Sequence, residues 1–464
     1  MADIRLSIKK IVVNACRLVL AAVFVFSGYV KAIDPLGTQY KLHDYAEAAG
    51  QFSIFGFQFS FSSLAPDWLT LGASVALSAA EFCLGIFLLF AIQRRLVSRL
   101  TLAFMVVMTF VTLWLYIADP IEDCGCFGDA LKLSNGQTLL KNLVLLACAT
   151  VVARWPLRMV RFISETNQWI VINYSILFVV ISSLWSLYTL PSFDFRPYHI
   201  GADIRKGMEI PEGAPQPKFE TTFILQKDGE QREFTLDNYP DSTWTFVDSR
   251  TVQIEKGYVP PIHDFSIVQG DSLDITDEVL GNPGYIFLLC SPHLEQADDA
   301  NFGDIDQIYE YAEEHHYPFY CLTASTDEHI ARWVELTGAE YPFCTTDETT
   351  LKTIIRSNPG LLLLRNGVVI GKWSHNQLPH IDPALSAEPL ESFEFAQLSD
   401  GADTTSDNTL SAATARKIGV VLLWFALPLA VLTLADRTWA WTKWFRRKRR
   451  RKEKREKAQS EKKE

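Results

Sequence analysis

Two cysteines separated by one glycine, Cys124 and Cys126, are the residues of this sequence best suited to chemistry. A disulfide between them would close a very small, strained ring, and strain makes a disulfide easier to reduce. Gly125 and Gly128 supply the backbone freedom that such a tight closure requires. The spacing therefore favours a redox-active pair. A structural pairing and a metal site remain as alternatives, and the metal is the weaker because no histidine or second cysteine pair lies nearby in the sequence.

Charged residues flank this pair and act on it in opposite directions. Asp123 and Asp129 would raise the pKa values of the two thiols, because a negative charge disfavours a thiolate. Lys141 would lower them for the converse reason. The sequence leaves the balance between these charges open.

Six apolar stretches must hold these residues in place, and each is close to the length that crosses about 30 Å of hydrocarbon. They are Ile11 to Ile33, Trp68 to Ile92, Leu96 to Ala118, Leu139 to Trp155, Ile170 to Leu190 and Ile418 to Leu434. Clusters of lysine and arginine fall on alternate connections and at both ends of the chain, which predicts that these segments are cytoplasmic. We therefore expect a multi-pass protein of the bacterial inner membrane, with the cysteine loop and a large polar region on the periplasmic side.

The net charge of −11 indicates topology and gives no reason to expect a nucleic-acid partner. The acidic residues lie in the polar region, whereas the basic residues lie in short connections and in the tail, residues 446–464. That tail is either a stop-transfer signal or a segment that binds anionic membrane lipid.

An ionisable residue within a membrane span is a candidate for function, and Glu81 lies deep in the second span. Counting about 1.5 Å per residue from the cytoplasmic face puts Arg17 about 9 Å deep and Glu81 about 16 Å deep. Arg17 is therefore the expected partner of Glu81. The pair either fixes helix packing or relays protons to the cysteines. Lys31 and Asp34, at the outer end of the first span, are interfacial anchors or line one outer pocket with the cysteine loop.

A family resemblance rests on these motifs taken together. Ser27-Gly28-Tyr29-Val30-Lys31 with Asp34-Pro35, then Glu81, Asp123 to Gly128, and Lys141-Asn142 resemble the DoxX family, in particular its branch similar to the methylamine utilisation protein MauE. The resemblance covers about the first 155 residues. It implies a four-helix membrane bundle similar to vitamin K epoxide reductase and DsbB, with a part in disulfide handling or in the maturation of proteins outside the membrane.

The polar region contains two patterns. Alternating segments around Thr222 to Leu225 and Glu233 to Leu236 predict a β-hairpin. After residue 257, strands alternate with helices and a hairpin at Arg365-Asn366-Gly367 closes the pattern, which predicts an α/β sheet. The predicted elements are the strands Tyr285 to Leu289, Pro318 to Leu322, Gly360 to Leu364 and Val368 to Trp373, and the helices Asp304 to His315 and Asp327 to Thr337.

This order of elements, with Pro359 immediately before a strand, resembles a thioredoxin-like domain of the peroxiredoxin and thiol-reductase kind. The resemblance puts Cys290 at the position of the first redox cysteine and Pro359 at that of the family's cis-proline. His293 replaces the second cysteine, so the domain is either a degenerate binding module or a single-thiol enzyme in which His293 lowers the pKa of Cys290. Cys321 and Cys344 either pair with each other or are core thiols.

The expected fold is an α-helical membrane bundle, a four-helix unit plus two further spans, with an inserted α/β thioredoxin-like domain outside the cytoplasm. The expected segments are 1–165 for the four-helix unit, 166–195 for the fifth span, 196–256 for a β-rich segment, 257–385 for the thioredoxin-like domain, 386–416 for a linker, 417–445 for the sixth span and 446–464 for the tail.

Two functions follow from these expectations. The first is a thiol-disulfide oxidoreductase whose partner is an extracytoplasmic thiol protein or a quinone. The second is a non-enzymatic membrane assembly or maturation factor whose outer domain only binds its partners.

Overall fold

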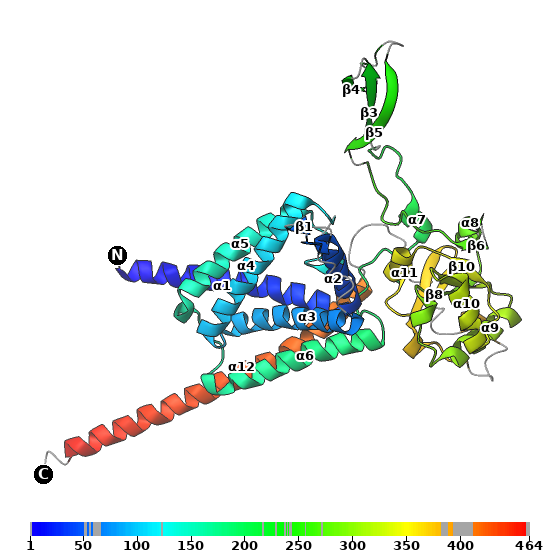
Figure 1. The fold of residues 1–464 in the computed structure, drawn as a ribbon. Helices are drawn as coiled ribbons and strands as arrows, with labels where there is room; N and C mark the ends of the chain where they lie inside the picture. The colour runs from blue at the N-terminus through cyan, green and yellow to red at the C-terminus, as the bar shows by residue number, and fades with distance from the viewer. Residues whose placement is uncertain are drawn as a thin grey trace. The chain divides into compact units, whose positions relative to one another are not determined.

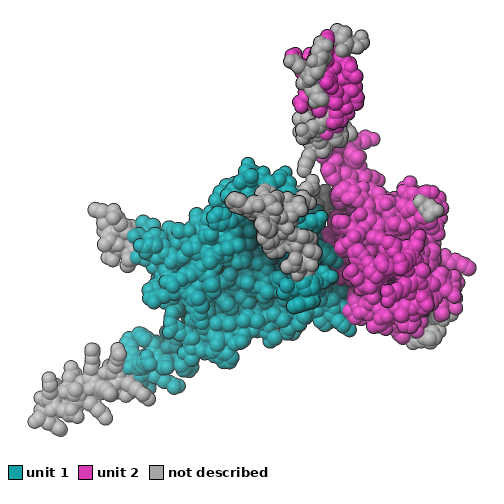
Figure 2. Space-filling view, in the orientation of Figure 1, with its two compact units in different colours: residues 1–195, 406–464 teal, residues 196–405 magenta. Residues whose placement is uncertain are grey.

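The computed structural model describes residues 2–460 except 51–52, 55–56, 59–65, 122–123, 216–217, 228–229, 236–237, 239, 241–243, 256, 271, 382–387 and 393–411. The chain divides into two compact units, residues 1–195 with 406–464 and residues 196–405 (Figure 2). The expected linker, residues 386–416, lies largely outside the described residues.

The first unit is helical (Figure 1). Its helices are α1 (Ala2–Ile33), α2 (Pro35–Gly50), α3 (Asp67–Phe90), α4 (Arg94–Ala118), α5 (Asn135–Arg154), α6 (Gln168–Tyr188) and α12 (Ala412–Ser460). Among the described residues, six of these helices are long and apolar enough to cross a membrane, and α2 is not one of them. Apolar side chains such as Phe110 and Leu140 are 66% exposed on their outer faces. The six predicted spans are confirmed, and the chain has the features of a multi-pass membrane protein.

The first helix packs closely against the third through two glycines. A Cβ atom on Gly28 would lie 2.3 Å from the backbone nitrogen of Phe82, and one on Gly85 would lie 2.7 Å from the backbone nitrogen of Val25. Such contacts exclude any side chain and allow the two backbones to touch. The contacts fix the register of α1 against α3 and set Gly28 level with Phe82.

The last helix is held beside α6 by a buried carboxylate and by aromatic rings. Asp436 of α12 accepts hydrogen bonds from the backbone nitrogen of Ser164 at 2.8 Å, from its hydroxyl at 2.6 Å, and from the Asn167 amide at 2.7 Å. Nearer the start of α12, the ring centroid of Phe425 lies 4.5 Å from that of Phe178 in α6. The sixth span is therefore an integral part of the helical unit.

The second unit contains a seven-stranded sheet in the order β12-β11-β8-β9-β10-β6-β7. The strands are β6 (Val268–Gln269), β7 (Leu273–Asp274), β8 (Tyr285–Ser291), β9 (Phe319–Thr323), β10 (Phe343–Thr345), β11 (Gly360–Arg365) and β12 (Val368–Ser374). Strands β8, β9 and β10 are parallel neighbours, and β11 pairs antiparallel with both β8 and β12. The helices of this unit are α7 (Ile204–Met208), α8 (Thr276–Gly281), α9 (Phe302–Glu314), α10 (Asp327–Thr337) and α11 (Glu348–Ile354). The predicted α/β elements after residue 257 are therefore confirmed.

Two turns of this unit agree with the sequence patterns. Asn366 and Gly367 both have positive φ, 52° and 77°, as the tight turn between β11 and β12 requires. The predicted hairpin is also present, with Phe223 of β3 (Lys218–Lys227) opposite Phe234 of β4 (Glu230–Thr235). A third strand that the sequence analysis did not predict, β5 (Thr245–Glu255), pairs with β3 to complete a separate small sheet.

Candidate functional site

The two loop cysteines lie side by side between α4 and α5. Their sulfur atoms are 2.6 Å apart, and both thiols are free. Gly125 and Gly128 have φ values of 58° and 52°, in the left-handed region that favours glycine. The distance is about half an ångström longer than a disulfide bond, so the pair can close with little movement. Gly125 and Gly128 therefore supply the backbone freedom that the sequence analysis assigned to them.

Hydroxyl groups from two other helices hold the backbone of this loop. The Tyr45 hydroxyl of α2 donates to the carbonyl oxygen of Cys124. The Ser27 hydroxyl of α1 lies 2.6 Å from the carbonyl oxygen of Cys126 and donates to it. Each cysteine is thus anchored through its own carbonyl, which leaves the two thiols facing each other.

The electrostatics separate the two thiols. The hydrogen bond with Cys126 lowers the pKa of Cys124 to about 6 against the opposing effect of burial, and the Thr138 hydroxyl and the positive charge of Lys141 add to the lowering. The same hydrogen bond, together with burial, raises the pKa of Cys126 well above its ordinary value. A thiolate at Cys124 beside a protonated Cys126 is the starting state for thiol-disulfide exchange.

This asymmetry gives a pH prediction for the reduced protein. Because the pKa of Cys124 is lowered, its thiolate is present above pH about 6 and is lost as the pH falls through that value. Alkylation of Cys124 by iodoacetamide should therefore be half-maximal near pH 6, whereas an ordinary cysteine gives about 8.5. In Lys141→Met the midpoint should move upward, because a cation that stabilises the thiolate is gone. A wild-type midpoint near 8.5 would contradict the assignment of Cys124 as the thiolate.

A buried ion pair lies next to the cysteine loop. Glu81 of α3 accepts from the Lys31 ammonium at 2.7 Å through one carboxylate oxygen and from the Ser27 hydroxyl at 2.7 Å through the other. Lys31 and Glu81 are 5% and 3% exposed, so neither charge reaches solvent. Since Ser27 also contacts the carbonyl of Cys126, its one hydroxyl hydrogen is shared between two acceptors and links the ion pair to the cysteine loop.

The predicted partnership of Arg17 with Glu81 is wrong. Arg17 donates to the backbone carbonyl of Val160 at 2.5 Å, and its guanidinium lies 5.0 Å from the ring centre of Phe162. The depths estimated from the sequence assumed that the first two spans both begin at the same cytoplasmic membrane surface. Helix α1 starts at Ala2 and is about 48 Å long, and the contact between Gly28 and Phe82 sets its register, so Lys31 is the cation that reaches Glu81.

The other charged candidates have different places. Asp34 caps α2 by accepting from the backbone nitrogen of Gly37 at 2.9 Å. Lys141 lies 4.2 Å from the ring centre of Phe127, within the cysteine loop. Asp129 lies in the 3-10 turn Gly128–Ala130, and Asp123 lies outside the described residues. The structure thus brings Lys31, Glu81 and Lys141 to the pair and uses the Asp34 side chain at a helix start.

The expected redox cysteine of the soluble unit is inaccessible. Cys290 is 0% exposed within β8, and burial raises the pKa of its thiol to about 12, with Lys372 rather than His293 acting as the nearby cation. His293 instead contacts two carboxylates, Glu348 at 2.9 Å and Glu295 at 3.2 Å. The expectation that His293 lowers the pKa of Cys290 is therefore wrong. The peptide bond between Asn358 and Pro359 is cis, as the resemblance implied.

Cys321 and Cys344 cannot pair with each other in this sheet. Cys344 lies opposite Leu322 of β9, whereas Cys321 lies opposite Phe343 of β10. Successive residues of a strand point to opposite faces of a sheet, so the two thiols lie on opposite faces. Both are free and buried, which leaves them as core thiols.

Two contributors to the site escaped the sequence analysis. Tyr45 and Thr138 lie in stretches with no chemical motif, and neither gave a signal by spacing. Ser27 appeared only as part of the motif that carries the family resemblance, and no contact was predicted for its hydroxyl. Its spacing of four residues from Lys31 puts both on one face of α1, and that pattern is the signal that could have indicated a shared partner.

The fold and the site together define a multi-pass helical membrane protein with a pair of thiols where the α4–α5 loop meets α1 and α2. Residues 9–155 match the family model described as Methylamine utilisation protein MauE, so this part of the chain is similar to that family. Residues 219–256 match a Domain of unknown function (DUF8463), and this range covers most of the three-stranded sheet. No curated protein and no solved structure matches the chain.

Proposed function

We propose that the protein is a membrane thiol-disulfide oxidoreductase that uses Cys124 and Cys126. The observation that carries the proposal is the pair of free sulfurs 2.6 Å apart in a glycine-containing loop, with the pKa of one thiol lowered to about 6. A lowered pKa supplies the attacking thiolate, and a short loop supplies a disulfide that is readily reopened.

When the cysteine pair is oxidised, the Cys124 thiolate and the Cys126 thiol form a disulfide and release two electrons and one proton. A quinone would accept both electrons and two protons, one of them from solvent, to become a quinol. A disulfide in a substrate protein would accept the same electrons and protons as two thiols. The proposal includes either acceptor. The match of residues 9–155 to the family described as Methylamine utilisation protein MauE supports a membrane protein of the methylamine utilisation type.

The location of the pair is part of the proposal. The alternation of basic loops supports a bacterial inner-membrane protein with both termini in the cytoplasm and the cysteine loop and soluble unit in the periplasm. The side chains of Arg95, Arg99 and Arg154, on the α3–α4 and α5–α6 side of the bundle, are exposed, as that orientation requires.

A single labelling experiment tests the compartment and the chemistry together. Intact cells are treated with a membrane-impermeant maleimide before and after addition of an external dithiol, then quenched in acid. The pair should be labelled from outside, and labelling should increase after reduction, because a labile disulfide opens to thiols. Labelling only after the cells are opened would refute the orientation. Labelling that does not increase after addition of the dithiol would refute the redox assignment.

The second candidate function is a membrane assembly or maturation factor with no redox step. The burial of Cys290, 0% exposed with a raised pKa, favours a soluble unit that binds rather than reacts. We propose that this unit is a degenerate thioredoxin-like domain that positions a partner protein, and that the membrane unit is of the DoxX type. The two functions differ in one respect, since only the oxidoreductase needs both loop thiols.

A further inference from the structure

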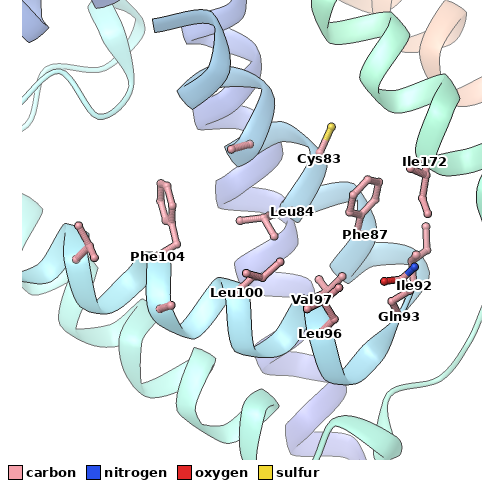
Figure 3. Close-up of a pocket in the computed structure, with 13 residues that line it drawn as sticks. Cys83, Leu84, Phe87, Ile92, Gln93, Leu96, Val97, Leu100, Phe104 and Ile172 are labelled. Atoms are coloured by element: carbon pink, nitrogen blue, oxygen red, sulfur yellow. The ribbon is translucent and has the colours of Figure 1, made fainter. Parts of the chain in front are cut away.

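An apolar groove lies between α3, α4 and α6, with a cavity volume of about 660 Å³. Figure 3 shows side chains of all three helices facing it, including those of Phe87, Leu100, Phe104 and Ile172. Apart from Gln93 and the thiol of Cys83, the described side chains that line it are hydrocarbon. A groove of this character in a membrane helix bundle fits a hydrocarbon chain and offers nothing to a soluble polar ligand.

Two arginines with unused donors lie near Gln93, a lining residue of the groove: Arg94 is next to it in α4, and Arg161 is close enough to Arg94 for the two charges to interact. Arg94 follows Gln93 directly and donates from one terminal nitrogen to the carbonyls of Leu157 and Met159, at 2.9 and 3.1 Å. Its Nε atom is buried and has no partner among the described residues, and the same holds for the Nε of Arg161. A buried donor without a partner costs about 1–3 kcal/mol, so this pair of arginines has unused hydrogen-bonding capacity. The Arg161 side chain is 35% exposed, so an acceptor from outside the chain can reach its guanidinium.

The two guanidinium groups also repel each other. Arg94 and Arg161 lie close enough for their charges to interact unfavourably, and Glu165 offsets this only in part through its ion pair with Arg161 at 2.5 Å. Arg95 and Arg99 are exposed on α4 beside the groove-lining Leu96 and Leu100. An excess of positive charge at one end of an apolar groove is complementary to a ligand that joins an anion to a hydrocarbon chain.

We propose that this groove is a binding site for one anionic phospholipid, with its phosphate on Arg94 and Arg161 and one acyl chain along Leu96, Leu100 and Phe104. Basic pockets between membrane helices on the cytoplasmic side bind lipid head groups in this manner. Arginine suits the phosphate because its planar fork donates two parallel hydrogen bonds. The site is independent of the cysteine pair, and it differs from the basic tail in holding a chain as well as a charge.

The test uses the full-length protein in detergent, with phosphatidylglycerol or phosphatidylcholine of the same acyl chains added and bound lipid measured by native mass spectrometry. Wild type should bind phosphatidylglycerol about tenfold more tightly than phosphatidylcholine. Both lipids offer a phosphate, but only phosphatidylcholine also carries a cation, which the arginines repel, and a difference of about 1.4 kcal/mol gives that factor. Arg161→Gln and Arg94→Gln should each reduce the preference. Leu100→Trp should weaken binding of both lipids about tenfold, because the indole fills the groove while both arginines remain.

Lys132→Gln is the matched control, because it removes one exposed positive charge in the α4–α5 loop and should leave the preference unchanged. If Arg94→Gln fails to fold, because Arg94 supports the α5–α6 connection, Leu100→Trp still tests the proposal. Equal wild-type binding of the two lipids would overturn the proposal, and so would unchanged binding in Leu100→Trp. Displacement of phosphatidylglycerol by an equal concentration of inorganic phosphate would overturn it too, because the groove would then contribute nothing.

Discussion

Replacing either loop cysteine by serine is expected to remove the redox activity entirely. In Cys124→Ser and in Cys126→Ser, the remaining thiol has no partner at 2.6 Å, so no disulfide can close between these positions. The two variants should be equally inactive, because exchange needs one thiolate to attack and a second thiol to resolve the mixed disulfide. The measurement is the thiol-disulfide state of extracytoplasmic proteins in cells that carry each variant.

Cys290→Ala is the matched control, since it removes a cysteine that is 0% exposed and has a raised pKa. It should retain wild-type activity once corrected for protein abundance. Cys126→Ser, which keeps the attacking thiol Cys124, should also trap its partner as a mixed disulfide that a reductant releases. Full activity in both loop variants would reject the oxidoreductase and favour the assembly factor.

Separating the buried ion pair should have the largest effect on stability. Lys31→Gln leaves the Glu81 carboxylate without its cation, and Glu81→Gln leaves the Lys31 ammonium without its anion. Each change should cost about 3–5 kcal/mol, because a single charge stays buried. The double variant should cost less than the sum of the two, since no unpaired charge remains. Unfolding of the purified protein in detergent measures the four free energies of this cycle.

Arg17 provides a second cycle as a control. Arg17→Gln and Glu81→Gln should add independently, because Arg17 contacts Val160 and Phe162 rather than Glu81. Strict additivity for Lys31 with Glu81, or strong coupling for Arg17 with Glu81, would show that the register of α1 against α3 differs from the one described.

The parts of the fold that follow from local pattern could be predicted from sequence. Six apolar runs gave six spans because hydrocarbon thickness fixes their length, and Asn366-Gly367 gave a hairpin because both residues accept positive φ. Burial could not be predicted in the same way. Cys290 lies where the resemblance places a reactive cysteine, yet it is part of β8, a central strand between β9 and β11 whose residues are all buried.

The residues of the candidate site were predicted from the sequence, but the cation that pairs with Glu81 was not. The cysteines, Lys31 and Glu81 were all identified from the sequence, but the choice between Lys31 and Arg17 depends on how far α1 slides along α3. That register is set by Gly28 and Gly85, whose effect is a close approach of two backbones and leaves no periodic signal. Tyr45 was missed because α2 begins at Pro35, where the sequence indicated only the end of the first span.

The carboxylate of Asp436 has a consequence for biogenesis. Its partners, Ser164 and Asn167, precede α6 and are synthesised long before α12. The segment from Thr189 to Ser411 must be made first, which takes tens of seconds at about 5–20 residues per second. During that interval the nascent bundle lacks α12, and the polar groups of Ser164 and Asn167 remain without the Asp436 carboxylate as their acceptor. Insertion of α12 therefore acts as the closing step of assembly, and it occurs only after the whole soluble unit has left the ribosome.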